Sequence, residues 1–188
     1  MSRFSSALGA LAACILICAA DITLAQVSGD GPQLTPVRRT TIVTADPEAS
    51  LRFYRDLLGF TVEYDQIVSG GGTVALLAPG ATEGRNIALR FGEKMGGSIG
   101  LFWAPGLPEQ TACVSPALPG SVSVLLLTDD LAALRAKLDA AGVPSISPGT
   151  SYDRSRGPTD VYAVFDPNCV RVAIAEIKNE TLDESLNK

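Results

Sequence analysis

The side chains able to do chemistry are few, and their types exclude several mechanisms. The chain has 188 residues and contains no histidine, so Ser-His-Asp and Cys-His nucleophilic mechanisms are ruled out. The run Gly70-Gly71-Gly72 lacks the spacing of a phosphate-binding loop or of a dinucleotide-binding fingerprint. The candidates for general acid–base chemistry are therefore tyrosines and carboxylates.

Four side chains are weak candidates for a general acid or base: Tyr64, Asp65, Tyr152 and Asp153. All four are expected near strand ends or in a loop at the mouth of a site. Nothing in their spacing arranges them as a recognisable pair, and simple surface exposure is the favoured interpretation of each. Catalytic residues therefore stay unassigned at this stage.

Arg39 is a candidate for binding an anion. Its guanidinium carries a fixed fork of N–H donors that suits a carboxylate or a phenolate. The alternative is that Arg39 pairs with an acidic residue at a sheet end or points into solvent. The choice depends on the strand that carries Arg39.

The elements that position these residues form an internal repeat. Residues 38–60 read as a buried strand, a capped amphipathic helix and the entry to a second strand, and a fainter copy spans residues 121–143. Asp46 is a good helix N-cap, and Gly59 suits the left-handed conformation that ends a helix. Asp130 takes the place of Asp46 in the second copy. Such a repeat indicates one structural unit used twice.

Strands are predicted from stretches rich in β-branched and apolar residues. The predicted strands cover residues 37–44, 60–68, 87–91, 98–103, 121–128, 161–165 and 170–176. Residues 73–77 fit either a short strand or a helical turn inside an insertion. The Pro-containing stretch 104–120 is predicted to link the two units, and the stretch 145–158, rich in Gly, Pro, Ser and Arg, is predicted to be a mobile loop.

Two motifs in these units resemble those of a known superfamily. The run D-P-E-A-S-L-x-F-Y-R-D-L-L-G-F begins at Asp46, and the run V-F-D-P-N-C-V-R-V begins at Val164. Together they are similar to the vicinal oxygen chelate superfamily, which includes glyoxalase I, extradiol dioxygenases and bleomycin-resistance proteins. The resemblance implies an α+β fold in which two βαβββ modules form a half-open barrel around one cleft.

The resemblance covers about residues 37–177, and the composition of the segments on either side completes a domain plan for the chain. This plan comprises a signal peptide at 1–25, a leader at 26–36, the superfamily domain at 37–177 and a flexible tail at 178–188. Within the domain, the plan has a first module at 37–103, the linker at 104–120 and a second module at 121–177.

The resemblance also implies where a metal site would lie. In metal-dependent members, the first strand of each module offers a His seven residues before the helix-capping Asp, and the last strand offers a Glu. The equivalent positions of this chain hold Arg39, Ser123, Ala88 or Gly100, and Ala173. None of these is a usual ligand of a divalent ion. We therefore expect a metal-free cleft and no cofactor, and the metal-dependent activities of the superfamily are not transferred.

Alternation along the strands predicts which side chains face the cleft. The expected ligand-binding residues are Arg39, Thr41, Phe102, Ser123, Leu125, Arg171 and Ala173. For Phe102, packing in the core is the favoured alternative. A cleft of this composition is apolar with one or two arginines, and it suits a small apolar or anionic molecule.

The N-terminus is typical of an exported protein. Arg3 precedes an apolar run at residues 7–20, which is too short to span a bilayer comfortably and fits a secretory signal peptide cleaved after Ala25. A lipoprotein signal through Cys14 is the less favoured alternative. Both predict export, with the bacterial periplasm as the expected destination and no membrane span in the domain.

Two cysteines, Cys113 and Cys169, remain after the signal segment. In an oxidising compartment they invite one disulfide, and two separate buried thiols are the alternative.

The composition limits the classes of partner that the protein can bind. The net charge is −5, from 15 basic and 20 acidic residues, with no basic cluster, so nucleic acid is an unsuitable partner. The resemblance leaves a homodimer open. Three functions therefore stand: a metal-free module that binds a small molecule, a metal-independent lyase or isomerase, and a domain with a filled cleft that binds protein partners.

Overall fold

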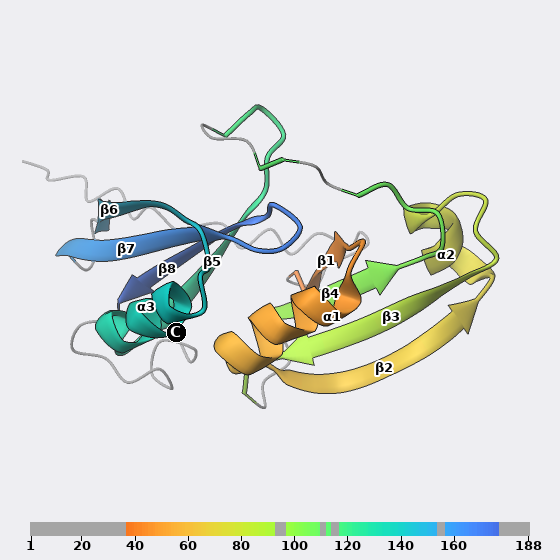
Figure 1. The fold of residues 1–188 in the computed structure, drawn as a ribbon, viewed down its shortest axis with the longest axis horizontal. Helices are drawn as coiled ribbons and strands as arrows, with labels where there is room; N and C mark the ends of the chain where they lie inside the picture. The colour runs from red at the N-terminus through yellow and green to blue at the C-terminus, as the bar shows by residue number, and fades with distance from the viewer. Residues whose placement is uncertain (1–36, 93–96, 110–111, 114–116, 154–156, 177–188) are drawn as a thin grey trace, which may run out of the picture. The chain divides into compact units, whose positions relative to one another are not determined.

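The computed structural model describes residues 37–92, 97–109, 112–113, 117–153 and 157–176, without side-chain detail for 147–159. All of these residues belong to one compact unit, residues 35–188. Strands and short helices follow one another in two modules of similar design (Figure 1). None of the helices in the described part of the chain has the length and hydrophobicity needed to cross a membrane.

The first module contains β1 (Arg39–Val43), α1 (Pro47–Leu51), a π-helical continuation η1 (Arg52–Leu57), β2 (Thr61–Ser69), α2 (Gly71–Leu77), β3 (Glu83–Arg90) and β4 (Ser98–Trp103). The second contains β5 (Ser123–Thr128), α3 (Leu131–Ala140), β6 (Ser145–Asp153), β7 (Gly157–Phe165) and β8 (Arg171–Glu176). Apart from the inserted α2, both follow the βαβββ order.

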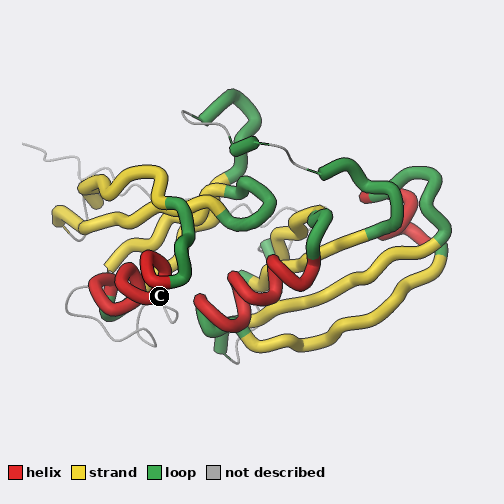
Figure 2. The backbone as a smooth tube through the Cα atoms, in the orientation of Figure 1, coloured by secondary structure: helices red, strands yellow, loops and turns green. Residues whose placement is uncertain are grey.

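Each module builds its own four-stranded sheet, with strand orders β1-β4-β3-β2 and β5-β8-β7-β6. In both, the first strand pairs in parallel with the last, and the other pairs are antiparallel. Figure 2 shows the strands of each module gathered beside a helix. Neither sheet closes into a barrel, which confirms the expected α+β, half-open arrangement.

The caps of the first helix form as the sequence predicts. The Asp46 carboxylate accepts a hydrogen bond from the Ala49 backbone N–H at 2.9 Å, and Gly59 adopts a φ of +83° just beyond η1. The helix packs its apolar side on the sheet, because Phe53 and Tyr54 share one buried cluster with Ile42 and Leu101. One face of the first sheet is therefore covered.

One sequence prediction needs revision, and one open alternative is decided. Residues 145–158 were expected to form a loop, but the backbone of 145–153 is the strand β6, paired antiparallel with β7. Because β6 is the last strand of its sheet, Pro148 is tolerated there without a ladder N–H. Residues 73–77 take the helical alternative, as part of α2.

Of the two alternatives for the cysteines outside the signal segment, the structure has the disulfide. Cys113 and Cys169 are bonded, with their Cα atoms 4.9 Å apart. The bond ties the segment after β4 to the turn before β8.

Candidate functional site

The face of the first sheet opposite α1 carries the polar side chains of interest. Thr41 pairs with Gly100, Gly100 with Ala88, and Ala88 with Tyr64, so these four residues form a row across all four strands. Residues paired across strands lie on the same face. Arg39 is two positions before Thr41 and shares that face.

Arg39 extends across the sheet to meet Tyr64. An Arg39 Nη1–H donates to the Tyr64 hydroxyl, and the guanidinium lies 5.2 Å from the centroid of the Tyr64 ring. The Arg39 Nε–H donates to the Ser98 hydroxyl at 3.4 Å, and Asn86 Nδ2 approaches the Tyr64 oxygen at 3.5 Å. The result is a partly buried cluster of one cation and three neutral polar groups, hereafter the Arg39 cluster (Arg39, Tyr64, Asn86 and Ser98).

Small residues beneath the cluster make this arrangement possible. A Cβ added to Gly100 would lie 2.8 Å from Arg39 Cδ and 2.8 Å from Thr41 Oγ1. Real Cβ atoms are not found this close, so the glycine leaves the space in which the arginine stem lies.

Arg39 differs from several neighbouring arginines because it has no acidic partner within the described ranges. Arg85 binds Asp65 and Glu48, Arg90 binds Glu63, and Arg55 binds Asp56. The partners recorded for Arg39 are the neutral hydroxyls of Tyr64 and Ser98. A partly buried cation with neutral partners is suited to receive an external anion.

The four acid–base candidates do not lie together in the structure. Tyr64 is in the Arg39 cluster, but Asp65 lies on the opposite face, where Arg85 donates two hydrogen bonds to its carboxylate at 2.8 and 2.6 Å. These hydrogen bonds lower the pKa of the Asp65 carboxyl. Asp65 is therefore the acidic half of a surface ion pair and not a general base. Tyr152 and Asp153 lie in β6, and their side chains are outside the described detail.

The seven predicted ligand-binding residues also separate into groups. Arg39 and Thr41 lie on the open face of the first sheet, whereas Ser123, Leu125, Arg171 and Ala173 share a face of the second sheet through the β5–β8 pairing. There the Arg171 guanidinium lies 5.1 Å from the Phe165 ring centroid. Among the described contacts, none joins this second group to the Arg39 cluster.

Phe102 takes the favoured alternative, packing in the core, and not the role of a ligand-binding residue. It is 0 % exposed and packs with Val74, Ala78 and Ala104 beneath α2. The inserted helix buries the ring, so Phe102 supports the sheet and is not available to a ligand.

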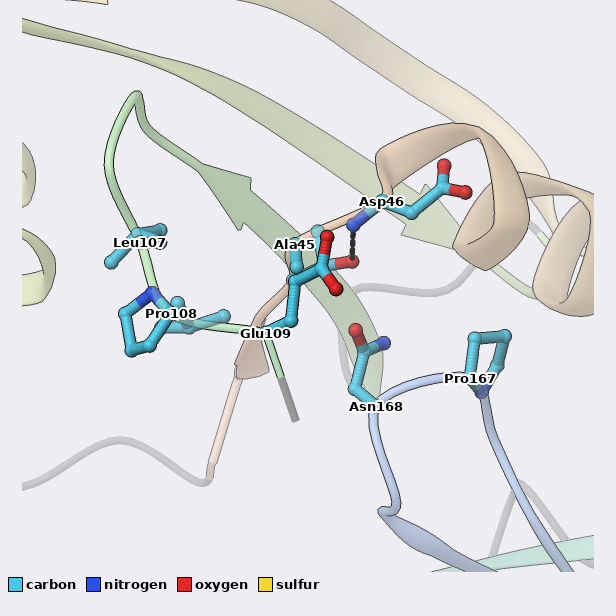
Figure 3. A pocket seen from close by; sticks show the side chains of 9 residues that line it. Ala45, Asp46, Leu107, Pro108, Glu109, Pro167 and Asn168 are labelled. Carbon is cyan, nitrogen blue, oxygen red and sulfur yellow. Dashed lines mark hydrogen bonds between the residues drawn. The ribbon is translucent and has the colours of Figure 1, made fainter. Parts of the chain in front are cut away.

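A pocket of about 490 Å³ lies at the carboxyl end of β1. It is lined by Val43, Thr44, Ala45, Asp46, Leu107, Pro108, Glu109, Pro167 and Asn168. Figure 3 shows the Glu109 and Asn168 side chains beside the start of α1, with the hydrogen bond from the Asp46 backbone N–H to Thr44. The Glu109 carboxylate is unfavourable for an anion in this pocket, in contrast to the Arg39 cluster.

The residues present do not fit the divalent metal that the superfamily pattern implies. The position expected to supply a ligand from β1 holds the guanidinium of Arg39, a fixed positive charge. The other positions, Ala88 or Gly100, Ser123 and Ala173, offer a single hydroxyl between them. Within the described ranges, no group of three or more His, Cys, Asp or Glu side chains is placed to hold a metal ion.

Asn86 and Ser98 belong to the cluster but were not predicted. Ser98 pairs with Arg39 across β1 and β4, and Asn86 lies two positions before Ala88 on β3. Strand alternation could have placed both on the open face, but only after the register of three strands was known.

Comparisons with solved structures give the fold. A glyoxalase family protein from Bacillus cereus aligns with a TM-score of 0.65 at 15 % identity, covering 79 % of this chain and 98 % of that one. Glyoxalase I of Leishmania major aligns with a TM-score of 0.53 at 17 % identity over 82 % and 94 %. The antibiotic binding protein TnmS3 of Streptomyces sp. CB03234 aligns with a TM-score of 0.50 at 20 % identity over 79 % and 100 %.

Sequence comparison gives the family. No curated protein matches the chain significantly. The sequence model of the Glyoxalase/Bleomycin resistance protein/Dioxygenase superfamily matches residues 37–174, most of the chain and both modules. The chain therefore belongs to the Glyoxalase/Bleomycin resistance protein/Dioxygenase superfamily.

Proposed function

We propose that this protein is an exported, metal-free binding protein that holds a small anionic molecule against the open face of its first sheet. The observation that carries this proposal is Arg39, a partly buried cation on that face whose hydrogen-bond partners in the described part of the chain are neutral hydroxyls. A carboxylate or phenolate would supply the missing negative charge and accept charge-assisted hydrogen bonds from the guanidinium.

The rest of the cluster supplies a second polar contact for the ligand. Tyr64 Oη accepts a hydrogen bond from Arg39, which leaves its own O–H free to donate to a second ligand oxygen. Gly100 and Ala88 lie buried beneath the cluster, so the ligand would lie against the outer side of the Arg39 cluster, beside the exposed Thr41. A few convergent polar groups of this kind orient the ligand in a small-molecule site.

Export is supported by two independent features of the chain. The apolar run at residues 7–20 behind Arg3 has the composition of a signal peptide. The Cys113–Cys169 disulfide is of the kind that persists in oxidising compartments such as the bacterial periplasm.

The anchor is tested by replacing Arg39 with Gln and measuring carboxylate binding by isothermal titration calorimetry. The probes are benzoate and 2-naphthoate, with benzamide as the uncharged counterpart. Loss of a charge-assisted hydrogen bond is worth about 1.5–3 kcal/mol, so we expect Kd to rise about tenfold or more. Arg52→Gln, an exposed arginine on η1, is the matched control and should bind like the parent chain.

Other outcomes would redirect the assignment. Carboxylate binding that Arg39→Gln leaves intact would remove Arg39 as the anchor. Turnover of a bound carboxylate that survives a chelator and disappears in Tyr64→Phe would favour the metal-independent lyase or isomerase, because Tyr64 is the acid–base candidate in the cluster. Failure of every probe to bind or to raise the melting temperature would favour a domain whose open face is filled and which binds protein partners.

A further inference from the structure

A second pocket lies where η1 ends beside β5 and α3. Its lining is more apolar than that of the pocket at the carboxyl end of β1. It has a volume of about 470 Å³, within the range of about 300–1,000 Å³ typical of small-molecule sites. Its inner wall is formed by Leu58, Phe60 and Ile174, which are buried members of the core cluster. The floor of the pocket is therefore apolar and formed by residues packed in the core.

The mouth of this pocket gathers exposed apolar side chains. Phe91, Leu125 and Leu127 line it and are 50 %, 64 % and 39 % exposed. Single exposed apolar residues are ordinary, but several around one concavity mark a binding site. The strand β5 supplies both leucines, and Phe91 follows β3.

The charges at the pocket wall argue against an anionic ligand. Lys137 and Asp129 are the charged residues that line it in the described part of the chain. The Lys137 ammonium donates to the backbone carbonyls of Asp56 and Leu57 at 2.9 and 2.7 Å. These are the last carbonyls of η1, whose partial negative charge opposes an incoming anion, as does Asp129. An uncharged ligand meets neither obstacle.

The aromatic residues favour a ring-shaped occupant. The rings of Phe60 and Phe91 have centroids 5.6 Å apart at an interplanar angle of 63°. Edge-to-face pairs of this kind can be extended by a further ring, which contacts one face or one edge. From the volume, the apolar lining and the rings, we propose that this pocket binds a small uncharged aromatic molecule, separately from the anion held by the Arg39 cluster.

The probe for the test is N-phenyl-1-naphthylamine, an uncharged fluorophore whose emission rises in an apolar site, titrated into the full chain. We expect saturable binding that Leu125→Gln weakens about tenfold or more, because a polar amide replaces apolar wall. Leu125 is mostly exposed, so the variant should melt like the parent chain, and Leu127→Gln is a second mouth variant. Leu76→Gln on α2, 78 % exposed and outside the pocket, is the matched control and should bind normally.

Competition separates this proposal from the proposed function. 2-Naphthoate anchored by Arg39 should leave the fluorescent probe bound. Either binding proposal can therefore be contradicted while the other still holds.

Five results would overturn the inference. The first two are the absence of saturable binding and equal binding by the parent chain and Leu125→Gln. Another is tighter binding of 8-anilinonaphthalene-1-sulfonate that Lys137→Met abolishes, which would make the ligand an anion. A dimer in sedimentation velocity that Leu125→Gln dissociates would assign the pocket to a second copy of the chain. Binding that appears only after removal of residues 177–188 would assign it to the chain's own C-terminal segment.

Discussion

Two glycines of the first sheet matter because neighbouring side chains occupy the space that a Cβ atom would fill. Gly100 lies under the stem of Arg39, and Gly84 lies under the ring of Phe102, whose Cζ would be 2.6 Å from an added Cβ. Both make close contacts, but the neighbours differ in how far they can move. The arginine stem is flexible, whereas the Phe102 ring is fully buried.

Gly100→Ala is therefore expected to displace Arg39 while keeping the fold. The added methyl group would lie 2.8 Å from Arg39 Cδ and Thr41 Oγ1, and overpacking of this kind costs about 1–3 kcal/mol of unfolding free energy. We expect weaker 2-naphthoate binding, measured by calorimetry, with a moderately lower melting temperature. Gly84→Ala is the comparison, and it should lose more stability because its Cβ also meets the Trp103 backbone oxygen at 2.8 Å. Unaltered naphthoate affinity in Gly100→Ala would mean that the position of Arg39 does not matter.

Alternation along a strand predicts which side chains share a face, but it does not predict which of them a distant element will cover. Arg39 and Thr41 share a face because they are two apart on one strand. The burial of Phe102 depends on α2, whose Gly-rich start and short apolar run fit a strand as well as a helix. The sequence carried no signal that this insertion would fold over β4.

At the scale of elements, caps and repeats were predictable and the edge of the second sheet was not. The caps Asp46 and Asp130 each accept from the backbone N–H three residues on, at 2.9 and 2.8 Å. These are local interactions, so a local pattern predicts them. Strand β6 is held by its pairing with β7, and no short window of its own Pro- and Gly-containing sequence reports that pairing.

The disulfide is the element-scale feature with the largest expected effect on stability. It joins Cys113 to Cys169 across 56 positions, and closing a loop of this length is worth about 2–5 kcal/mol through the unfolded state. The double variant Cys113→Ala with Cys169→Ala should lower the free energy of unfolding by that amount, measured in urea. Dithiothreitol should lower the stability of the parent chain and leave the variant unchanged. Equal stability of both chains without reductant would contradict a stabilising bond.

At the scale of the whole molecule, a buried polar joint holds the two modules together. The Tyr54 hydroxyl donates to the Asp166 carboxylate at 2.9 Å across 112 positions, and Asn168 Nδ2 donates to the Ser50 hydroxyl at 3.0 Å. The Asp166 carboxylate also accepts from the Val170 backbone N–H at 2.7 Å. The motif containing Asp166 was recognisable, but its partner Tyr54 was not, because nothing local links residues so far apart in sequence.

Burial is the main cause that raises the pKa of the Asp166 carboxyl above its ordinary 3.8, and hydrogen bonds from Val170, Asn168 and Tyr54 offset part of the rise. The folded chain therefore holds this proton more tightly than the unfolded chain. The contribution of Asp166 to the free energy of unfolding is greatest below pH 3.8. It falls as the pH rises through the raised pKa of the folded chain, and it is constant above that pKa.

Asp166→Asn removes the titration of this side chain. Subtracting its unfolding free energy from that of the parent chain, in urea across a pH series, should give a difference that falls with pH in this window. Tyr54→Phe removes a donor that lowers this pKa, so it should extend the window to higher pH. A difference that rises with pH would show that the joint favours the carboxylate over the acid.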